Sequence, residues 1–304
     1  MNNKYLITVV GPTAIGKTAL AIDLANAFST EIISSDSRQF FKEMKIGTAV
    51  PDEAELSAAK HHFIQHKSIF ENYSVGDFER EALELLSELF KKHDVVIMAG
   101  GSGLYNKAVM DGLDDFPEVD SSIREGLNKR LQEEGIEGLQ LQLKNLDPSH
   151  YKNIDSQNPH RLIRALEICL GTGKPYSSFL QQKKSNRAFK SIQIGLTADR
   201  DVIYDRINRR VDIMMENGLL EEAEKLYPNR ELNALQTVGY RELFEYFDGN
   251  WTLDFAISEI KKNTRRFAKR QLTWLRKDES VLWFDYETDT GEIIDKINSI
   301  LSKK

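Results

Sequence analysis

A glycine-rich segment near the amino terminus has the residue spacing of a phosphate-binding loop. Gly11, Gly16, Lys17 and Thr18 match the pattern GxxxxGK followed by Ser or Thr, and they lie between an apolar run and a helical pattern. Backbone amides and the positive helix end attract phosphate oxygens, the lysine neutralises their charge, and the threonine hydroxyl can hold Mg²⁺. We therefore predict a site for two linked phosphates. Its predicted residues are Gly11, Pro12, Thr13, Ala14, Ile15, Gly16, Lys17 and Thr18.

This loop alone does not identify a reaction, because nucleotide hydrolases, small-molecule kinases and other phosphate-using proteins share it. A motor-type ATPase usually ends an apolar strand with an acid that binds magnesium. The best candidate strand here, residues 95–99, ends instead in Gly100 and Gly101. The sequence therefore disfavours a nucleotide hydrolase.

Asp36 follows a second apolar run, residues 31–35, that we predict to be a strand. In a doubly wound sheet its carboxylate should face the same crevice as the phosphate loop, where it could act as a base. Ser35, Asp36 and Ser37 are also residue types that favour helix starts. This segment alone therefore leaves a general base and a helix cap equally open.

Six segments resemble, in the same order, the signatures of bacterial-type tRNA dimethylallyltransferases, and together they span nearly the whole chain. These segments are GPTAIGKT, SSDSRQFFKEMKIGTAVP, GGSGLY, QNPHRLIRALE, QTVGYRE and KRQLTWLR. The resemblance implies transfer of a dimethylallyl group from its diphosphate to the exocyclic amine of the adenine 3′ of the anticodon, with release of diphosphate. It also implies Asp36 as general base, Thr13, Lys17 and Arg210 as catalytic residues at the diphosphate, and Mg²⁺ at Thr18.

The implied chemistry explains why these residue types are needed. An adenine amine is a poor nucleophile, so a base that removes its proton while the bond forms assists the reaction. The departing diphosphate gathers negative charge, which fixed cations and amides stabilise. The target base lies in a single-stranded loop, where a protein can flip it out and read its edges.

The resemblance also implies contacts with tRNA. Those at the target nucleotide are Asp36, Ser37, Arg38 and Gln39. Those at the anticodon stem-loop are Gln157, Asn158, Pro159, His160, Arg161, Gln236, Thr237, Val238, Gly239, Tyr240, Arg241, Lys269, Arg270, Gln271, Leu272, Thr273, Trp274, Leu275 and Arg276. Ser102 and Arg124 are further candidates.

Charge is unevenly distributed along the chain, whose net charge is -6. Residues 261–277 hold eight Lys or Arg and no acid, whereas residues 111–120 hold five acids and no base. Local potential decides whether phosphate is attracted, so the basic segment favours RNA contact. Within it, Ala268, Leu272 and Leu275 form an apolar stripe that should face the core. Phe267 and Trp274 could stack on bases, but aromatic residues at helical spacing more often belong to the core.

Other features have simpler interpretations. Asn158 and Pro159 suit a helix start, while a phosphate contact by His160 and Arg161 is equally open. We assign His61, His62 and His66 to a helix surface rather than to a metal site. The single cysteine, Cys169, excludes a disulfide framework, is expected in the core, and fits a reducing compartment.

These residues must be positioned by alternating strands and helices, which predict an α/β fold: a P-loop-containing parallel sheet with helices on both faces. Strands are expected at residues 5–10, 31–35, 95–99, 192–196 and 281–284. Helices are expected at residues 17–28, 77–92, 201–217 and 253–276, and at the carboxyl terminus. Residues 121–134 and 158–170 carry helical patterns inside an all-helical insertion domain.

We therefore predict a catalytic core in two parts, residues 1–113 and 185–304, the second with the basic helix. The insertion, residues 114–184, is predicted to bind the anticodon stem-loop. The expected partners are tRNA and dimethylallyl diphosphate. The apolar amino-terminal run is too short for a signal or membrane helix, so a cytoplasmic protein without a membrane partner is expected. A monomer is also expected.

Three alternatives remain. A small-molecule or nucleoside kinase also places an acid after the second strand, but it would leave the basic helix unexplained. An adenylate prenyltransferase would share the loop chemistry but not the insertion. A non-catalytic RNA-binding protein would not need Asp36.

Overall fold

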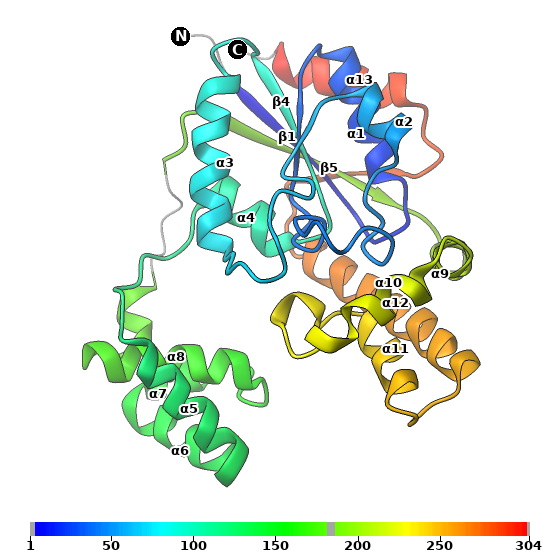
Figure 1. Ribbon diagram of the computed structural model, residues 1–304. Helices are drawn as coiled ribbons and strands as arrows, with labels where there is room; N and C mark the ends of the chain where they lie inside the picture. Colours follow the sequence, from blue (N-terminus) through cyan, green and yellow to red (C-terminus); the bar gives the residue numbers. More distant parts are fainter. Residues whose placement is uncertain (1–3, 181–185, 303–304) are drawn as a thin grey trace. The chain divides into compact units, whose positions relative to one another are not determined.

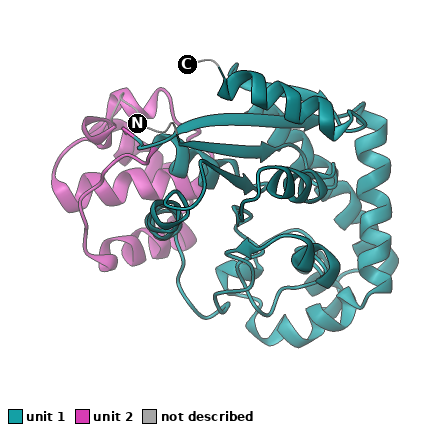
Figure 2. Ribbon diagram, turned by 90° about the horizontal axis from the view of Figure 1, so that it is seen from above, with its two compact units in different colours: residues 1–111, 187–304 teal, residues 112–186 magenta. Residues whose placement is uncertain are grey.

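The computed structural model describes residues 4–180 and 186–302. The chain divides into two compact units, residues 1–111 with 187–304 and residues 112–186, coloured separately in Figure 2. The first unit is therefore built from two stretches of chain that are distant in sequence. Among the described residues, no helix combines the length and apolarity needed to cross a membrane.

The first unit contains a parallel sheet of six strands in the order β3-β2-β4-β1-β5-β6. The strands are β1 (Tyr5–Val10), β2 (Ile32–Ser34), β3 (His61–His62), β4 (Val95–Ala99), β5 (Lys190–Thr197) and β6 (Val281–Asp285). Every residue of β1 is buried, as expected for a central parallel strand that is covered on both faces. The predicted fold class is confirmed.

Helices cover both faces of this sheet (Figure 1). On one face, Ile7 of β1 shares a core with α1 (Lys17–Ala27) and α13 (Thr290–Leu301). On the other, the adjacent Leu6 shares a core with α3 (Val75–Leu89) and α4 (Gly103–Asp111). Neighbouring strand residues point to opposite faces, so one apolar run serves both cores.

A separate helical core lies beyond the carboxyl ends of the strands. It is formed by α9 (Arg200–Glu216), α10 (Leu219–Leu226), α11 (Tyr240–Phe247) and α12 (Leu253–Leu275), with the short helices Tyr227–Asn229 and Asn233–Leu235. The sequence predicted α9 and α12 within a few residues but did not predict α10, α11, the short helix α2 (Glu53–Ala58) or β3. These elements are short, so their own residue patterns are weak.

The sheet brings three strand ends together. Ala99 at the end of β4 lies opposite Val9 of β1 and Ser34 of β2. A Cβ atom on Gly100 would lie 2.4 Å from Ser35 Oγ, so only glycine permits this approach. The phosphate loop, the Asp36 segment and the Gly100 turn therefore start from neighbouring points.

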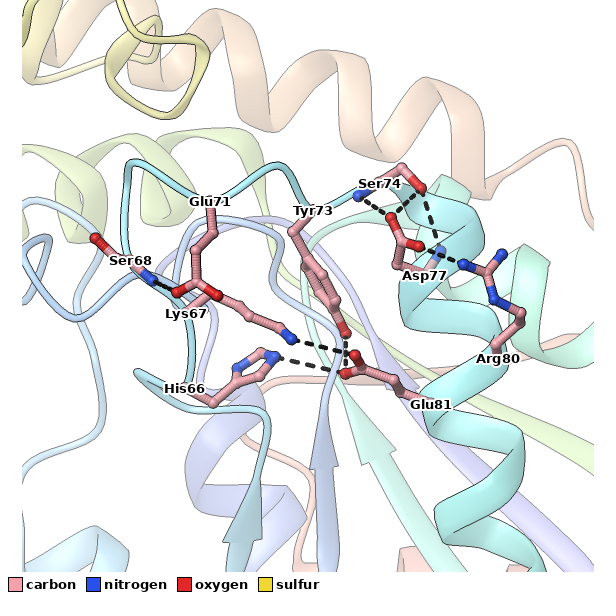
Figure 3. Close-up of polar contacts among 9 residues, drawn as sticks. All are labelled: His66, Lys67, Ser68, Glu71, Tyr73, Ser74, Asp77, Arg80 and Glu81. Carbon is pink, nitrogen blue, oxygen red and sulfur yellow. Dashed lines mark hydrogen bonds and ion pairs between the residues drawn. The ribbon is translucent and has the colours of Figure 1, made fainter. Parts of the chain in front are cut away.

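Polar contacts fix the segment between β3 and α3 (Figure 3). Glu81 of α3 accepts hydrogen bonds from Lys67 Nζ at 3.1 Å and Tyr73 Oη at 2.8 Å, and its Oε2 lies 4.0 Å from His66 Nε2. The rings of His66 and Tyr73 each lie 5.3 Å from that of buried Phe40. This network packs against Phe40, the residue that immediately follows the Asp36–Gln39 turn.

The predicted helix-surface position of the three histidines is wrong. His61 and His62 form β3, which pairs with β2, and His66 lies in the following segment. Their surroundings differ: His62 Nε2 lies 2.6 Å from Glu31 Oε2, whereas His66 lies among aromatic rings. Burial lowers the pKa of His66, which favours its neutral form.

The second unit is helical. It contains α5 (Ser121–Glu134), α6 (Glu137–Leu146), α7 (Pro148–Tyr151), α8 (Pro159–Thr172) and the short helix Tyr176–Phe179. Leucines 127, 139, 143, 162 and 166 form its core together with Cys169, as predicted for that cysteine. The unit's predicted role in binding RNA stays a prediction.

Candidate active site

The phosphate loop joins β1 to α1 and leaves the start of the helix available to a ligand. Gly11 has φ 146° and Gly16 has φ 113°, conformations that favour glycine. Gly16 is the helix N-cap and makes no side-chain cap, and the first turn carries no acid. The amides and partial positive charge of this helix end are therefore not already satisfied by a carboxylate.

Lys17 lies in a site that is short of negative charge. Its Nζ donates a 2.7 Å hydrogen bond to the Pro12 carbonyl oxygen. Burial, and secondly the charge of Arg210, lower the pKa of Lys17 to about 8, although Asp36 opposes the shift. An anion bound beside Lys17 would relieve this deficit, as expected of a diphosphate site.

Two arginines of α9, one turn apart, reach the phosphate loop. Arg210 Nη1 donates to Thr13 Oγ1 at 3.2 Å, and Arg206 Nε donates to the Ala14 carbonyl oxygen at 2.8 Å. Arg209 pairs instead with Asp205. The structure therefore places Arg210, and not its neighbour, beside Thr13, and it adds Arg206, which the sequence analysis missed.

Asp36 lies two residues beyond β2 and begins a turn, not a helix. Its Oδ1 accepts a 3.1 Å hydrogen bond from the Arg38 amide. Among the described residues, none donates a hydrogen bond to Oδ2, so this oxygen is available to accept a proton. The helix-cap alternative is therefore wrong, and the general-base interpretation stays a prediction.

The other residues of this turn form hydrogen bonds within the protein. Arg38 Nη1 donates to the Ala234 carbonyl oxygen at 2.7 Å, and Gln39 Nε2 donates to the Ala49 carbonyl oxygen at 2.8 Å. The Ser102 hydroxyl accepts from the Ser37 amide at 3.0 Å. These predicted RNA-contact residues thus hold the turn in place, and their contact with RNA stays a prediction.

Gln271 of α12 joins the phosphate loop to the Gly101 turn. The Thr13 amide donates to Gln271 Oε1 at 3.0 Å, and Gln271 Nε2 donates to the Gly101 carbonyl oxygen at 2.9 Å. A Cβ on Gly101 would lie 2.7 Å from that nitrogen, so a larger residue here would displace the Gln271 amide. The structure gives Gln271, predicted only as an RNA contact, a role in positioning the loop.

Two other predicted RNA contacts have buried side chains. Tyr240 packs its ring on Gly47 and donates its hydroxyl to Glu222 at 2.7 Å. Leu275 packs with Val10 and Val281. Both side chains lie in the interior: Leu275 faces the core as predicted for the apolar stripe of α12, and α11 turns Tyr240 toward the core. Contact of these two positions with RNA stays a prediction.

Two adjoining cavities open at this site. One, of about 680 Å³, is bordered by the Gly100–Tyr105 segment, the Gln236–Gly239 loop with Arg241, and α12. The other, of about 600 Å³, is bordered by the phosphate loop and by Arg206 and Arg210. We call them the acceptor-side and phosphate-side cavities. Both are bordered by Thr13, Asp36, Thr48, Gly100, Gly101, Arg210, Phe267 and Gln271. The prediction that Asp36 faces the same crevice as the phosphate loop is confirmed.

Oxygen donors that suit Mg²⁺ border the phosphate-side cavity. They are the Thr18 hydroxyl and the carboxylates of Asp36 and Glu55. Magnesium commonly binds through one or two such groups together with substrate phosphates and water. No cluster of three or more His, Cys, Asp or Glu that could hold a metal ion occurs in the described ranges.

The basic segment, residues 261–277, begins within α12 and ends two residues beyond it, and its cations fall into two groups. Lys261 pairs with Asp212 at 2.6 Å and Lys262 pairs with Glu259, while Arg265 donates to Asn208 and Arg266 donates to Asn263. The exposed cations without such pairs among the described residues are Lys269, Arg270, Arg276 and Lys277. The positive surface is therefore concentrated toward the carboxyl end of the helix.

The apolar stripe predicted for α12 is confirmed, since Ala268 and Leu275 are buried and Leu272 is partly buried. The expectation that Phe267 and Trp274 belong to the core is wrong. They are 40% and 42% exposed and border the acceptor-side cavity. Each lies one residue before a stripe position, which turns it about 100° away from the buried face.

Comparison with known proteins agrees with this geometry. The model of the IPP transferase family matches residues 39–278. The chain belongs to the IPP transferase family. It is 65% identical over 297 residues to a tRNA dimethylallyltransferase of Christiangramia forsetii, and the match covers 98% of each of the two chains. It is 64% identical over 297 residues to a tRNA dimethylallyltransferase of Flavobacterium johnsoniae, and that match covers 96% of each chain.

The protein is also similar to a solved structure. The tRNA isopentenylpyrophosphate transferase from Bacillus halodurans is 40% identical, with a TM-score of 0.73. The match covers 99% of this chain and 97% of the other. The chain is thus an enzyme of the prenyltransferase type, as the sequence predicted.

In the helical unit of this family member, the predicted start of α8 is confirmed. Asn158 is its N-cap and accepts from the Arg161 amide at 3.2 Å, with Pro159 in the first turn. Gln157, His160 and Arg161 are exposed, and their contact with phosphate stays a prediction.

Arg124, in contrast, is engaged within the unit. It forms a two-point ion pair with Glu167, at 3.1 and 2.7 Å. Burial alone would raise the pKa of Glu167, but hydrogen bonds from Arg124 and Arg164 lower it. This pair gives Arg124 a structural role, while its predicted RNA contact is untested.

Sequence reasoning missed Glu222 of α10. Its carboxylate accepts hydrogen bonds from the amides of Lys45, Ile46 and Gly47, at 2.8–3.0 Å, as well as from Tyr240. It therefore holds the loop that leads to Thr48, which borders both cavities. No local signal reveals this role, because the three loop amides are more than 170 residues away from Glu222.

Proposed function

We propose that this enzyme transfers the dimethylallyl group of dimethylallyl diphosphate to the exocyclic amine of the adenine 3′ of the anticodon in tRNA, releasing diphosphate. The observation that carries this proposal is the pair of cavities that share Asp36, Thr13 and Arg210. A donor phosphate bound on one side and a base on the other would meet at these residues. The names of the similar proteins support the same reaction.

On the phosphate side, the loop amides and Lys17 bind the diphosphate, and Arg210 and the Thr13 hydroxyl lie beside it. As the carbon–oxygen bond breaks, its electron pair passes to the diphosphate oxygen. Fixed donors stabilise that charge without having to reorganise. Thr18 would help to hold Mg²⁺, which would supply further neutralisation of the leaving group.

On the acceptor side, Asp36 receives the proton of the adenine amine as the nitrogen–carbon bond forms. Oδ2 is the oxygen available for this transfer, because Oδ1 accepts from the Arg38 amide. The hydrogen bonds of Arg38, Gln39 and Ser102 keep the turn in place. A positioned base is effective because it is already within reach when the bond forms.

The proposal is tested by incubating the protein with unmodified tRNA, dimethylallyl diphosphate and Mg²⁺, and measuring the mass of the digested nucleosides. A dimethylallyl increment on adenosine is the expected result. Transfer of the γ-phosphoryl group of ATP to a small acceptor, without any prenyl increment, would instead support a kinase.

The exposed cations of α12 should contribute to tRNA affinity through phosphate contacts. We expect the double variant Lys269→Gln, Arg270→Gln to bind tRNA more weakly. Its plot of log affinity against log salt should be flatter by about 1.4 to 1.8, since each phosphate contact contributes about 0.7 to 0.9 to the slope. Filter binding at several salt concentrations measures both quantities.

The matched control is the double variant Lys261→Gln, Lys262→Gln on the same helix. Both lysines are already paired with acids of this protein. This variant should change the slope much less. Equal slopes in the two variants would contradict the assignment of phosphate contacts to the carboxyl-terminal half of α12.

A further inference from the structure

Phe267 lies at the junction of the two cavities and borders both of them. Of the described residues that border both, it alone has an aromatic side chain, and the others are polar, charged or glycine. The residue is 40% exposed. An apolar surface is therefore presented where the two substrates would meet.

The transferred group requires such a surface. Under the proposed function, the reacting carbon lies between the diphosphate and the adenine amine, so the five-carbon group must lie at the junction. Its apolar carbons gain free energy by leaving water. Other apolar side chains border a single cavity: Ile213 borders the phosphate side, and Met214 and Val238 border the acceptor side.

Folding does not explain the position of this ring. The buried face of α12 near it consists of Ala268, Gln271 and Leu275. Phe267 lies outside that face, where an exposed phenyl ring contributes little to stability. The Arg270 guanidinium lies 5.8 Å from the ring centroid, which favours one ring orientation.

We propose that the Phe267 ring is the wall against which the prenyl group of the donor lies. This inference rests on the proposed function and deepens it by assigning donor specificity to one side chain. The ring has two consequences. It limits the length of the prenyl chain, and it keeps water away from the allylic carbon. Water that reached this carbon would form a carbon–oxygen bond, lose a proton to solvent, and release diphosphate with a prenyl alcohol.

The test compares Phe267→Ala and Phe267→Tyr with the wild type and with Phe255→Ala. Phe255 is on the same helix and 48% exposed, but it borders neither cavity. Steady-state transfer to tRNA is measured with dimethylallyl and geranyl diphosphate as donors. Prenyl alcohol released without transfer is measured in the same reactions.

For Phe267→Ala we expect the KM for dimethylallyl diphosphate to rise about tenfold, because one pocket contact of this size has an effect of about 10- to 200-fold. The KM for tRNA should stay unchanged. The preference for dimethylallyl over geranyl diphosphate should fall by a similar factor, and the share of prenyl alcohol should rise. Phe267→Tyr keeps the ring and should behave like the wild type, as should Phe255→Ala.

Two outcomes would overturn the inference while leaving the proposed function intact. In one, Phe267→Ala transfers prenyl groups with unchanged donor selectivity and unchanged hydrolysis. In the other, only the KM for tRNA rises, which would assign the ring to a nucleobase. If the wild type transfers no prenyl group to tRNA, both the proposed function and this inference are wrong.

Discussion

Asp36→Asn should lower the turnover number for prenyl transfer by about a hundred- to ten-thousand-fold, the usual contribution of a positioned general base. Asparagine is nearly isosteric, and its amide oxygen can keep the hydrogen bond that Oδ1 accepts from the Arg38 amide. The turn should therefore persist, and tRNA affinity should change little. Single-turnover assays with saturating substrates, together with tRNA binding measurements, would separate the two effects.

Glu55→Gln is a suitable control for this prediction. Glu55 also borders the phosphate-side cavity, but it does not border the acceptor-side cavity. Removing its charge should cost far less turnover than removing that of Asp36. If Asp36→Asn kept more than a tenth of wild-type turnover, Asp36 would not be the base.

Lys17→Met should reduce turnover by about 10²- to 10³-fold, the size of effect seen when one fixed donor to a developing oxyanion is removed. It should also weaken binding of inorganic diphosphate. Lys17 is the residue of the phosphate loop whose charge responds to pH in an accessible range, because burial and Arg210 lower its pKa to about 8.

The sign of the pH effect follows from that pKa. Below about pH 8 the free protein already carries the protonated ammonium that an anion needs. Above it the ammonium is lost, and binding must take up a proton. Affinity for diphosphate should therefore fall, approaching about tenfold per pH unit for one proton taken up.

Calorimetric titration with inorganic diphosphate would measure this loss of affinity. A range from about pH 6.5 to about pH 9.5 spans the pKa of Lys17. In Lys17→Met the component of the slope due to Lys17 should vanish, which separates it from ionisation of the ligand. Lys91→Met, which removes a surface lysine paired with Glu88, should keep the wild-type slope. A wild-type slope in Lys17→Met would refute the assignment.

Much of the fold was predictable from local patterns. The apolar runs at β1, β4 and β5 identify buried strands, and the glycines at positions 11 and 16 identify a loop that needs positive φ. Asp36 was predictable as a site residue because it lies just beyond the carboxyl end of a strand of a parallel sheet. In each case the information lies within a few neighbouring residues, and backbone conformation is decided at that range.

The tertiary structure decided which side chains of the helices reach the site and what they contact there. A helical pattern shows which face of α12 is apolar, but not that Gln271 reaches the phosphate loop or that Phe267 borders both cavities. Arg206 and Glu222 likewise act through contacts with residues more than 170 positions away.

By itself, then, the sequence determined the phosphate loop, the strand that presents Asp36, and the family to which the chain belongs. Only the packing of α9, α10 and α12 against the strand ends decided which arginines reach the loop, which glutamine joins two turns, and which aromatic rings stay exposed. The physical reason is that backbone propensity and periodicity act over one or two turns, whereas the direction in which a side chain finds its partner depends on how whole elements pack.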